Sequence, residues 1–159
     1  MTLRITSESF DHDGAIPTKH TCEGVDVSPP LAWSGVPANT KSLVLIVDDP
    51  DAPDPNAPKM TWVHWVVYDI PKTATGLPED AAREGLPDGA REGRNDWKHV
   101  GWRGPCPPIG RHRYFHKLYA LDTTLPDLGQ PDKAAVERAM RGHVLAEATL
   151  VGTYVKRGQ

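Results

Sequence analysis

Cysteine is scarce in this sequence of 159 residues, which also lacks long apolar runs and a large excess of charge of either sign. Its two cysteines, Cys22 and Cys106, are too few for a disulfide scaffold or a four-thiolate zinc site. No apolar run approaches the roughly 20 residues that a membrane-spanning helix needs. The net charge is −3 and no basic stripe is present, which excludes the usual signature of a nucleic-acid-binding protein. We therefore expect neither a membrane span nor a nucleic-acid partner.

The sequence also lacks a recognisable targeting segment. Residues 1–8 do not contain the apolar core of a signal peptide. We therefore predict a cytoplasmic protein in which both cysteines are reduced thiols, with a single Cys22–Cys106 bridge as the alternative. Cys106 lies between two prolines, with no evident helix N-terminus to activate it, so we expect a structural and unreactive role for it.

Proline, by contrast, is abundant. The chain has 16 prolines, which is about twice the usual share of roughly 5%. Most of them separate apolar stretches, a pattern typical of short strands joined by stiff loops rather than of a helix bundle. The stretches with the composition of strands are residues 42–48, 62–70, 114–121 and 148–155. The sequence therefore predicts a mainly β protein.

Helices are predicted at only two places. Asp132 can cap a helix whose apolar stripe includes Val136 and Met140, with Gly142 as its stop signal. Residues 80–84 can form a further helical turn, and residues 73–103 read as a long polar surface loop. We predict one domain over residues 1–159, with one or two helices at its periphery.

Polar and aromatic side chains concentrate at the edges of rigid, proline-set turns. The segments that carry them are residues 49–53, 62–65 and 104–114. They supply two carboxylates, two imidazoles and a phenol, from Asp49, Asp51, His64, His112 and Tyr114. If the fold brings them together, they form a small polar pocket.

Each of these residues also has a purely structural interpretation. His64 lies in an apolar strand beside Trp62, where a histidine is either a hydrogen-bonded core residue or a pocket residue. Asp49 and Asp51 end a buried strand, where carboxylates commonly build turns. His112 and His116 would lie about 13 Å apart on a strand, too far for one metal ion, so we interpret His116 as an ordinary strand residue.

Taken together, these segments resemble the phosphatidylethanolamine-binding protein family, in its bacterial branch often called Raf-kinase-inhibitor-like. The matching segments run in family order from about Ser9 to Tyr154. They are Ile16-Pro17, residues 28–31 with Trp33, residues 49–53, Trp62 with His64-Trp65, residues 104–114 and residues 142–145. The resemblance implies an antiparallel β-sandwich with flanking helices, and a loop region that contains cis peptide bonds.

The resemblance also implies a small pocket for phosphate or phosphoryl head groups. Its predicted residues are Asp49, Asp51, Trp62, His64, Pro108, Gly110, His112 and Tyr114. A carboxylate that accepts a proton from one imidazole nitrogen keeps the ring charged, so that the second N–H faces the anion. Turn amides around Gly110 and the Tyr114 hydroxyl would add neutral donors.

The sequence thus predicts a non-catalytic binding protein without a cofactor, which modulates a kinase or another partner protein. Bacterial members of the family suggest a homodimer. One alternative is a protein-interaction or inhibitor module whose pocket is vestigial. A second is a metal enzyme that uses two histidines and one aspartate, as in non-haem iron sites. A third is catalysis by a Cys106–His112 pair or by an Asp and a His acting as acid and base.

Overall fold

The chain forms two β-sheets in a computed structural model that describes residues 2–157. The smaller sheet has the order β1-β3-β6, with strands Arg4–Thr6, Leu31–Ser34 and Gly76–Leu77. The larger sheet has the order β2-β9-β8-β4-β5-β7, with strands Gly14–Ala15, Val144–Val155, Arg111–Leu121, Ser42–Ala52, Met60–Pro71 and Arg91–Glu92. The strand pairs are antiparallel except for β2 beside β9. The predicted mainly β sandwich is confirmed.

The central strand β4 explains why its sequence is continuously apolar. It lies between β8 and β5, so both of its edges are hydrogen-bonded, and other elements of the fold cover both of its faces. Because side chains alternate along a strand, Leu43, Leu45 and Val47 enter one hydrophobic cluster, whereas Val44 and Ile46 enter another. Residues of both sets are 0% exposed. The two cores of the protein therefore share this strand.

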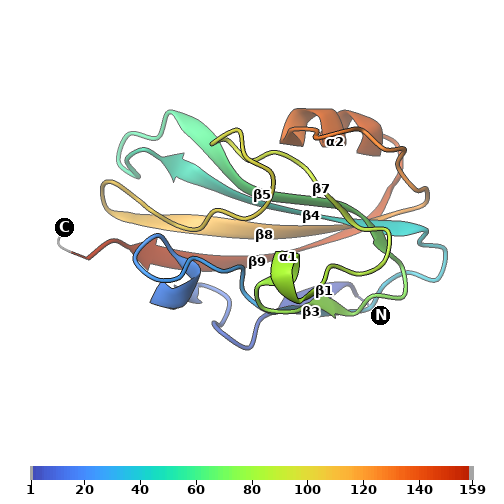
Figure 1. The fold of residues 1–159 in the computed structure, drawn as a ribbon, viewed down its shortest axis with the longest axis horizontal. Helices are drawn as coiled ribbons and strands as arrows, with labels where there is room; N and C mark the ends of the chain where they lie inside the picture. The colour runs from blue at the N-terminus through green and yellow to red at the C-terminus, as the bar shows by residue number, and fades with distance from the viewer. Residues whose placement is uncertain (1, 158–159) are drawn as a thin grey trace.

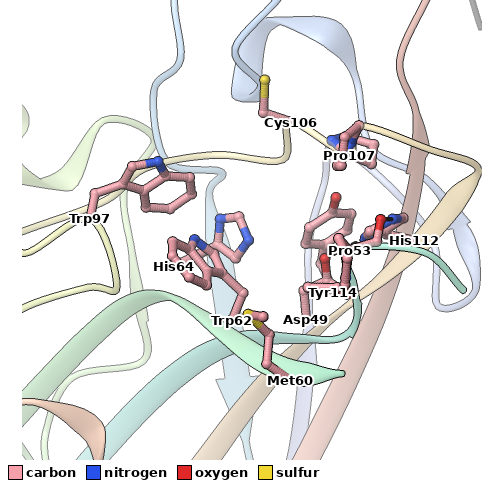
Figure 2. Close-up of a pocket in the computed structure, with 12 residues that line it drawn as sticks. Asp49, Pro53, Met60, Trp62, His64, Trp97, Cys106, Pro107, His112 and Tyr114 are labelled. Carbon is pink, nitrogen blue, oxygen red and sulfur yellow. Dashed lines mark hydrogen bonds and ion pairs between the residues drawn. The ribbon is translucent and has the colours of Figure 1, made fainter. Parts of the chain in front are cut away.

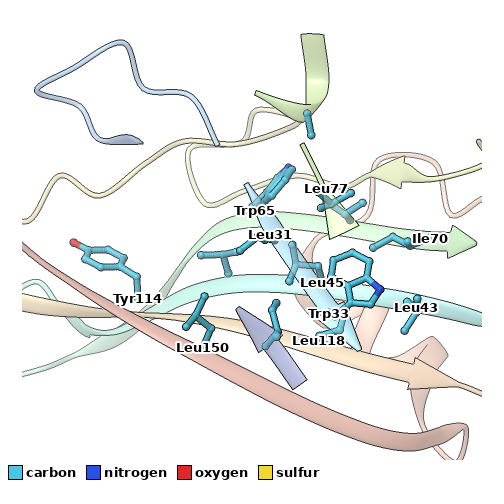
Figure 3. Packing of buried hydrophobic residues seen from close by; sticks show 14 of the residues in the cluster. Leu31, Trp33, Leu43, Leu45, Trp65, Ile70, Leu77, Tyr114, Leu118 and Leu150 are labelled. Carbon is cyan, nitrogen blue, oxygen red and sulfur yellow. The ribbon is translucent and has the colours of Figure 1, made fainter. Parts of the chain in front are cut away.

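Different elements cover the two faces of the large sheet. On one face lies the small sheet, and Figure 3 shows Leu31 and Trp33 of β3 beside Leu45 of β4. On the other face lies helix α2, Lys133–Met140, whose Val136 and Met140 belong to the second cluster. Figure 1 shows α2 and the small sheet on opposite sides of the large sheet.

Helix α2 forms where the sequence predicted it. The Asp132 side chain accepts a hydrogen bond from the Ala135 N–H at 2.9 Å, as an N-cap does. Gly142 follows the helix with a φ of +79°, and strand β9 begins at Val144. The short helix α1, Ala81–Glu84, confirms the predicted helical turn, and a 3₁₀ turn, η1, covers Thr18–His20. No helix among the described residues has the length and apolar character needed to cross a membrane.

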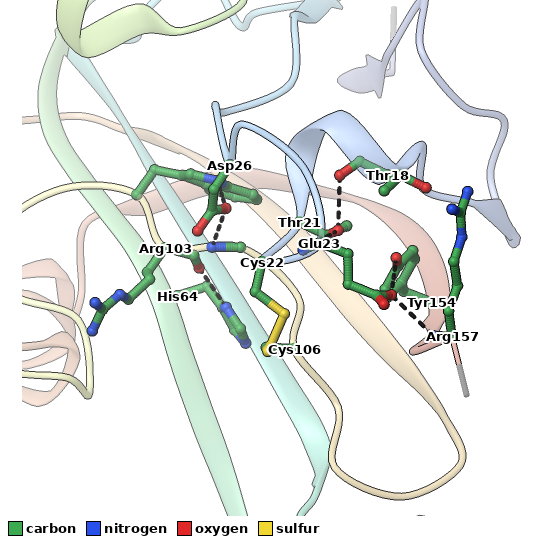
Figure 4. The surroundings of a disulfide bond; sticks show 12 residues. Thr18, Thr21, Cys22, Glu23, Asp26, His64, Arg103, Cys106, Tyr154 and Arg157 are labelled. Carbon is green, nitrogen blue, oxygen red and sulfur yellow. Dashed lines mark hydrogen bonds between the residues drawn. A yellow bond between two sulfur atoms is a disulfide. The ribbon is translucent and has the colours of Figure 1, made fainter. Parts of the chain in front are cut away.

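Two expectations from the sequence are corrected by the fold. Residues 73–103 are more than a surface loop, because they contain β6, α1 and β7 and bury Leu77 and Ala81. Their apolar residues are too widely spaced to show a period. The cysteines are not reduced thiols, since Cys22 and Cys106 form a disulfide bond across 84 residues of sequence (Figure 4). Only the folded chain brings their two loops together.

Candidate functional site

A cavity of about 230 Å³ lies where β4, β5 and β8 meet the loop of residues 104–108 (Figure 2). The residues that line it are Asp49, Ala52, Pro53, Met60, Trp62, His64, Trp97, Cys106, Pro107, Pro108, His112 and Tyr114. Six of the eight predicted site residues are among them, namely Asp49, Trp62, His64, Pro108, His112 and Tyr114. Segments far apart in the sequence therefore do converge on one cavity.

Asp51 and Gly110 do not line the cavity. The Asp51 carboxylate binds Arg113 on the neighbouring strand, with Oδ1 2.9 Å from Nη2 and Oδ2 3.0 Å from Nε. The hydrogen bond and charge of this guanidinium hold the pKa of Asp51 below its ordinary value. Gly110 has a φ of +77° and packs against Pro55, so it shapes the turn before β8. Asp51 therefore forms a structural ion pair with Arg113. A ligand role for the Gly110 amide stays a prediction.

Asp49 and His112 form the predicted carboxylate–imidazole pair. His112 Nδ1 lies 2.6 Å from Asp49 Oδ2, and Asp49 Oδ1 accepts the Asp51 N–H at 2.7 Å. Burial raises the pKa of Asp49, although the hydrogen bond from His112 opposes this shift. His112 Nε2 lies 2.9 Å from the Ile109 carbonyl and 3.1 Å from that of Pro53, which follows a cis peptide bond.

The second nitrogen of His112 therefore faces backbone oxygens. Carbonyl oxygens can only accept, so Nε2 carries a proton and donates it to them. This corrects the expectation that the second N–H of the ring faces the ligand. The proton between Nδ1 and Asp49 is shared within the pair, and wherever it resides the pair has no net charge.

His64 differs from His112 because its partner is a carbonyl. Its Nδ1 donates to the Arg103 carbonyl at 2.6 Å, which fixes the proton on that nitrogen. The ring lies edge-on to Trp97 and Tyr114, with centroid distances of 5.0 and 5.2 Å. Burial lowers the pKa of His64 to about 4, so the ring is neutral near pH 7. No described residue hydrogen-bonds to Nε2, whose lone pair is thus free to accept.

Tyr114 supplies the second unused polar group. Its hydroxyl is buried and has no hydrogen-bond partner among the described residues. Burial, with the nearby charge of Asp49, raises the pKa of Tyr114 well above its ordinary value, so the phenol stays neutral. Figure 2 shows the His64 ring on one side of the cavity, and Tyr114 and His112 on the other.

The sequence did not identify several residues of the cavity wall. Trp97 comes from the segment expected to be a surface loop, and it contacts Trp62 edge-on at a centroid distance of 5.5 Å. The Arg103 guanidinium lies over the Trp97 ring, 5.3 Å from its centroid. The only available signal was a tryptophan in a polar, aperiodic stretch, which also contains Trp102, and it does not say what the ring contacts. The other missed residues are Ala52, Pro53, Met60, Cys106 and Pro107.

The geometry bears on two of the alternative chemistries. Among the described residues, no group of three or more His, Cys, Asp or Glu side chains could hold a metal ion. Both nitrogens of His112 are already engaged, so neither offers a lone pair to a metal. Cys106 cannot act as a thiol nucleophile with His112, because it is bonded to Cys22.

Comparisons with known proteins agree with the fold. The family model of the phosphatidylethanolamine-binding protein matches residues 6–155. A UPF0098 protein of Methanothermobacter thermautotrophicus is 50% identical, over 98% of this chain and 100% of its own length. The crystal structure of a putative homologue from Chlamydia trachomatis has a TM-score of 0.89 at 41% identity, covering 98% of each chain. E. coli YbcL has a TM-score of 0.87 at 39% identity, covering 98% of this chain and 100% of that one.

Proposed function

Because the chain belongs to the phosphatidylethanolamine-binding protein family, we propose that its cavity binds a small phosphate or phosphoryl group and does not convert it. The observation that carries this proposal is the pair of unused polar groups in the cavity, the Tyr114 hydroxyl and His64 Nε2. The buried Tyr114 hydroxyl has no partner among the described residues, and this costs free energy that a hydrogen bond to a bound phosphoryl oxygen could recover. The volume of about 230 Å³ lies below the roughly 300–1,000 Å³ of pockets for larger ligands.

A binding role without catalysis is supported by how the reactive groups are engaged. Asp49 and His112 satisfy each other, and the remaining nitrogen of His112 donates to backbone carbonyls. Covalent catalysis needs a nucleophile within hydrogen-bond reach of a general base. Among the described lining residues, Cys106 has lost its thiol to the disulfide bond and Tyr114 has no base as a partner.

Calorimetric titration of metal-stripped protein with phosphoethanolamine at pH 6 tests the proposal. We expect saturable heat for the wild-type protein. Tyr114→Phe removes the hydroxyl and leaves the aromatic ring in place, so it should bind about five- to tenfold more weakly because one neutral hydrogen bond is lost. Tyr119→Phe is the matched control, because Tyr119 does not line the cavity. Absence of heat in the wild-type protein, or equal affinity in Tyr114→Phe, contradicts the proposal.

A protein-interaction role is the second candidate, and one observation favours it. Met60 and Ile109 are 45% and 53% exposed, and they lie at the cavity, since Met60 lines it and the Ile109 carbonyl accepts from His112. Exposed apolar side chains that cluster beside a pocket are typical of binding surfaces. Modulation of a kinase or another partner, and assembly into a homodimer, stay predictions from the sequence. Sedimentation of the purified protein tests the dimer.

The cytoplasmic location also stays a prediction, and the disulfide bond bears on it. Structural disulfides form mainly in oxidising compartments and in the intracellular proteins of hyperthermophiles. Alkylation of thiols in freshly lysed source cells, before any oxidation in air, shows whether Cys22 and Cys106 are bonded in the cell.

A further inference from the structure

The cavity offers no unpaired positive charge to a ligand. None of the lining residues is a lysine or an arginine among the residues that the structure describes. Asp49 and His112 form a pair without net charge. Tyr114 is a neutral phenol in an apolar wall that includes Met60 and Trp62. A dianion entering this cavity would lose its hydration without meeting a cation, which is costly.

Neighbouring charged groups do not change this balance. The titratable and charged groups around His64 are Asp48, Asp96, Arg103, His112, Tyr114 and His116, and Asp49 lines the same cavity. Asp48 is paired with Lys117 at 3.0 Å and with Lys133 at 2.7 Å. The guanidinium of Arg103 lies over Trp97 and is not part of the cavity lining. His64 therefore remains a neutral ring.

The tautomer of His64 determines what the cavity can recognise. With its proton donated to the Arg103 carbonyl, the ring presents Nε2 as an acceptor. An unprotonated phosphate oxygen also accepts, so the two would repel each other. A phosphate that carries a P–O–H group can donate to Nε2 instead. The Tyr114 hydroxyl can then donate to a second phosphate oxygen, and both unused groups gain a partner.

On the premise of the proposed function, we infer that the cavity selects singly charged phosphate monoesters, with the P–OH donating to His64 Nε2 and the Tyr114 hydroxyl donating to a phosphoryl oxygen. His64 is then the specificity-determining residue. A phosphate diester, the form found in an intact phospholipid, has the same single charge but no proton to donate. The ligand class is therefore a small phosphomonoester, with inorganic phosphate as its simplest member.

This selection implies a defined pH dependence. A phosphate monoester loses its second proton near pH 6, and the complex retains one proton shared between the ligand and His64. Above pH 6 both free partners have released that proton, so binding must take it up. The affinity is therefore flat between about pH 5 and pH 6 and falls by up to tenfold for each further pH unit.

Ethyl phosphate and dimethyl phosphate provide a matched test, because they are isomers with the same atoms. At about pH 5 each is mainly a monoanion, and they differ in that only ethyl phosphate retains a P–OH. By calorimetry we expect ethyl phosphate to bind at least about tenfold more tightly. Equal affinity of the isomers, or a preference for the diester, overturns this inference and leaves the proposed function standing. If neither isomer nor inorganic phosphate binds, the proposed function itself fails.

Substitution of His64 separates a role in specificity from a role in folding. His64→Met introduces an unbranched side chain of similar volume and removes the acceptor nitrogen. The preference for ethyl phosphate over dimethyl phosphate should therefore become smaller. The part of the fall in affinity above pH 6 that depends on His64 should become smaller as well. His12→Gln, at an exposed site, should retain the wild-type ratio. An unchanged isomer ratio in His64→Met contradicts the assignment. The isomer comparison in the wild-type protein decides the inference even if this variant does not fold.

Discussion

Three histidines on β5 and β8, the two strands that flank β4, show how a single hydrogen-bond partner sets the chemistry of a residue. His112 pairs with a carboxylate, His64 donates to a carbonyl, and His116 Nδ1 lies within 3.2 Å of the carbonyls of Tyr114 and Leu150. His116 Nε2 is buried without a partner among the described residues. Burial lowers the pKa of both His64 and His116 to about 4. These two rings are therefore buried as neutral groups.

The first prediction concerns stability between pH 6.5 and pH 4. The pKa of His116 is about 4 when folded and 6.5 when unfolded, so the unfolded chain binds more protons in this range. Stability must then fall as the pH falls, by up to about 1.4 kcal/mol per pH unit for each such histidine. Urea unfolding at several pH values measures how the free energy of unfolding depends on pH. The plot of this free energy against pH should have a shallower slope in His116→Phe than in the wild-type protein. An unchanged slope would mean that His116 is not buried as a neutral ring.

At the scale of an element, helix α2 illustrates how far local sequence reaches. Its start depends on one side chain, because Asp132 satisfies the Ala135 N–H that no helical carbonyl can reach. Its position depends on packing, since Val136 and Met140 are buried against the second face of the large sheet. A helix of eight residues is too short to be stable alone in water. The cap therefore adds to a stability that comes mainly from the sheet.

The second prediction tests this cap. Asp132→Ala should lower the free energy of unfolding by about 1 kcal/mol, within a usual range of roughly 0.5–2 kcal/mol. Asp132→Ser is the matched control, because a serine hydroxyl can accept the same N–H and should restore most of the loss. Chemical denaturation monitored by tryptophan fluorescence measures both variants. Equal loss in the alanine and serine variants would show that the hydrogen bond is not the cause.

At the scale of the whole molecule, the cavity exists because the loop of residues 104–108 is held by a covalent bond and by hydrogen bonds at the end of the large sheet. The disulfide bond joins this loop to the segment after η1 (Figure 4). Asp26 Oδ1 also accepts the Gly104 N–H at 2.9 Å and the Trp102 indole N–H at 3.2 Å. These contacts hold the Arg103 carbonyl, which orients His64, next to β5. Cys106 lines the cavity as well, so the same bond shapes the site and stabilises the fold.

The third prediction concerns this bond. Replacing both cysteines, Cys22→Ala together with Cys106→Ala, should lower the free energy of unfolding by roughly 2–4 kcal/mol, as expected for a long closed loop. Wild-type protein in excess dithiothreitol should unfold like the double variant, whereas the double variant should not respond to the reductant. Identical unfolding curves for the oxidised wild-type protein and the double variant would show that the bond contributes no stability.

Much of the fold follows from short-range signals in the sequence. The branched run of residues 42–48 predicts a strand with two buried faces, and β4 is that strand. Asp132 and Gly142 mark the ends of a helix, and α2 lies between them. The prolines indicate stiff turns, and the motif spacing indicates the family, which the comparisons confirm. Each of these signals is informative because the local conformational preference that it reflects depends mainly on residues that are neighbours along the chain.

Other features were decided by the tertiary structure alone. The sequence supplied six of the residues that line the cavity, but it could not place Trp97 there, and it preferred reduced thiols to the Cys22–Cys106 bridge that the fold forms. It also assigned the wrong partner to the second nitrogen of His112, which donates to the Pro53 and Ile109 carbonyls. The direction of a hydrogen bond depends on where backbone oxygens of distant segments come to lie. Residue types therefore determined which chemistry was available, and folding determined which atoms remained free to use it.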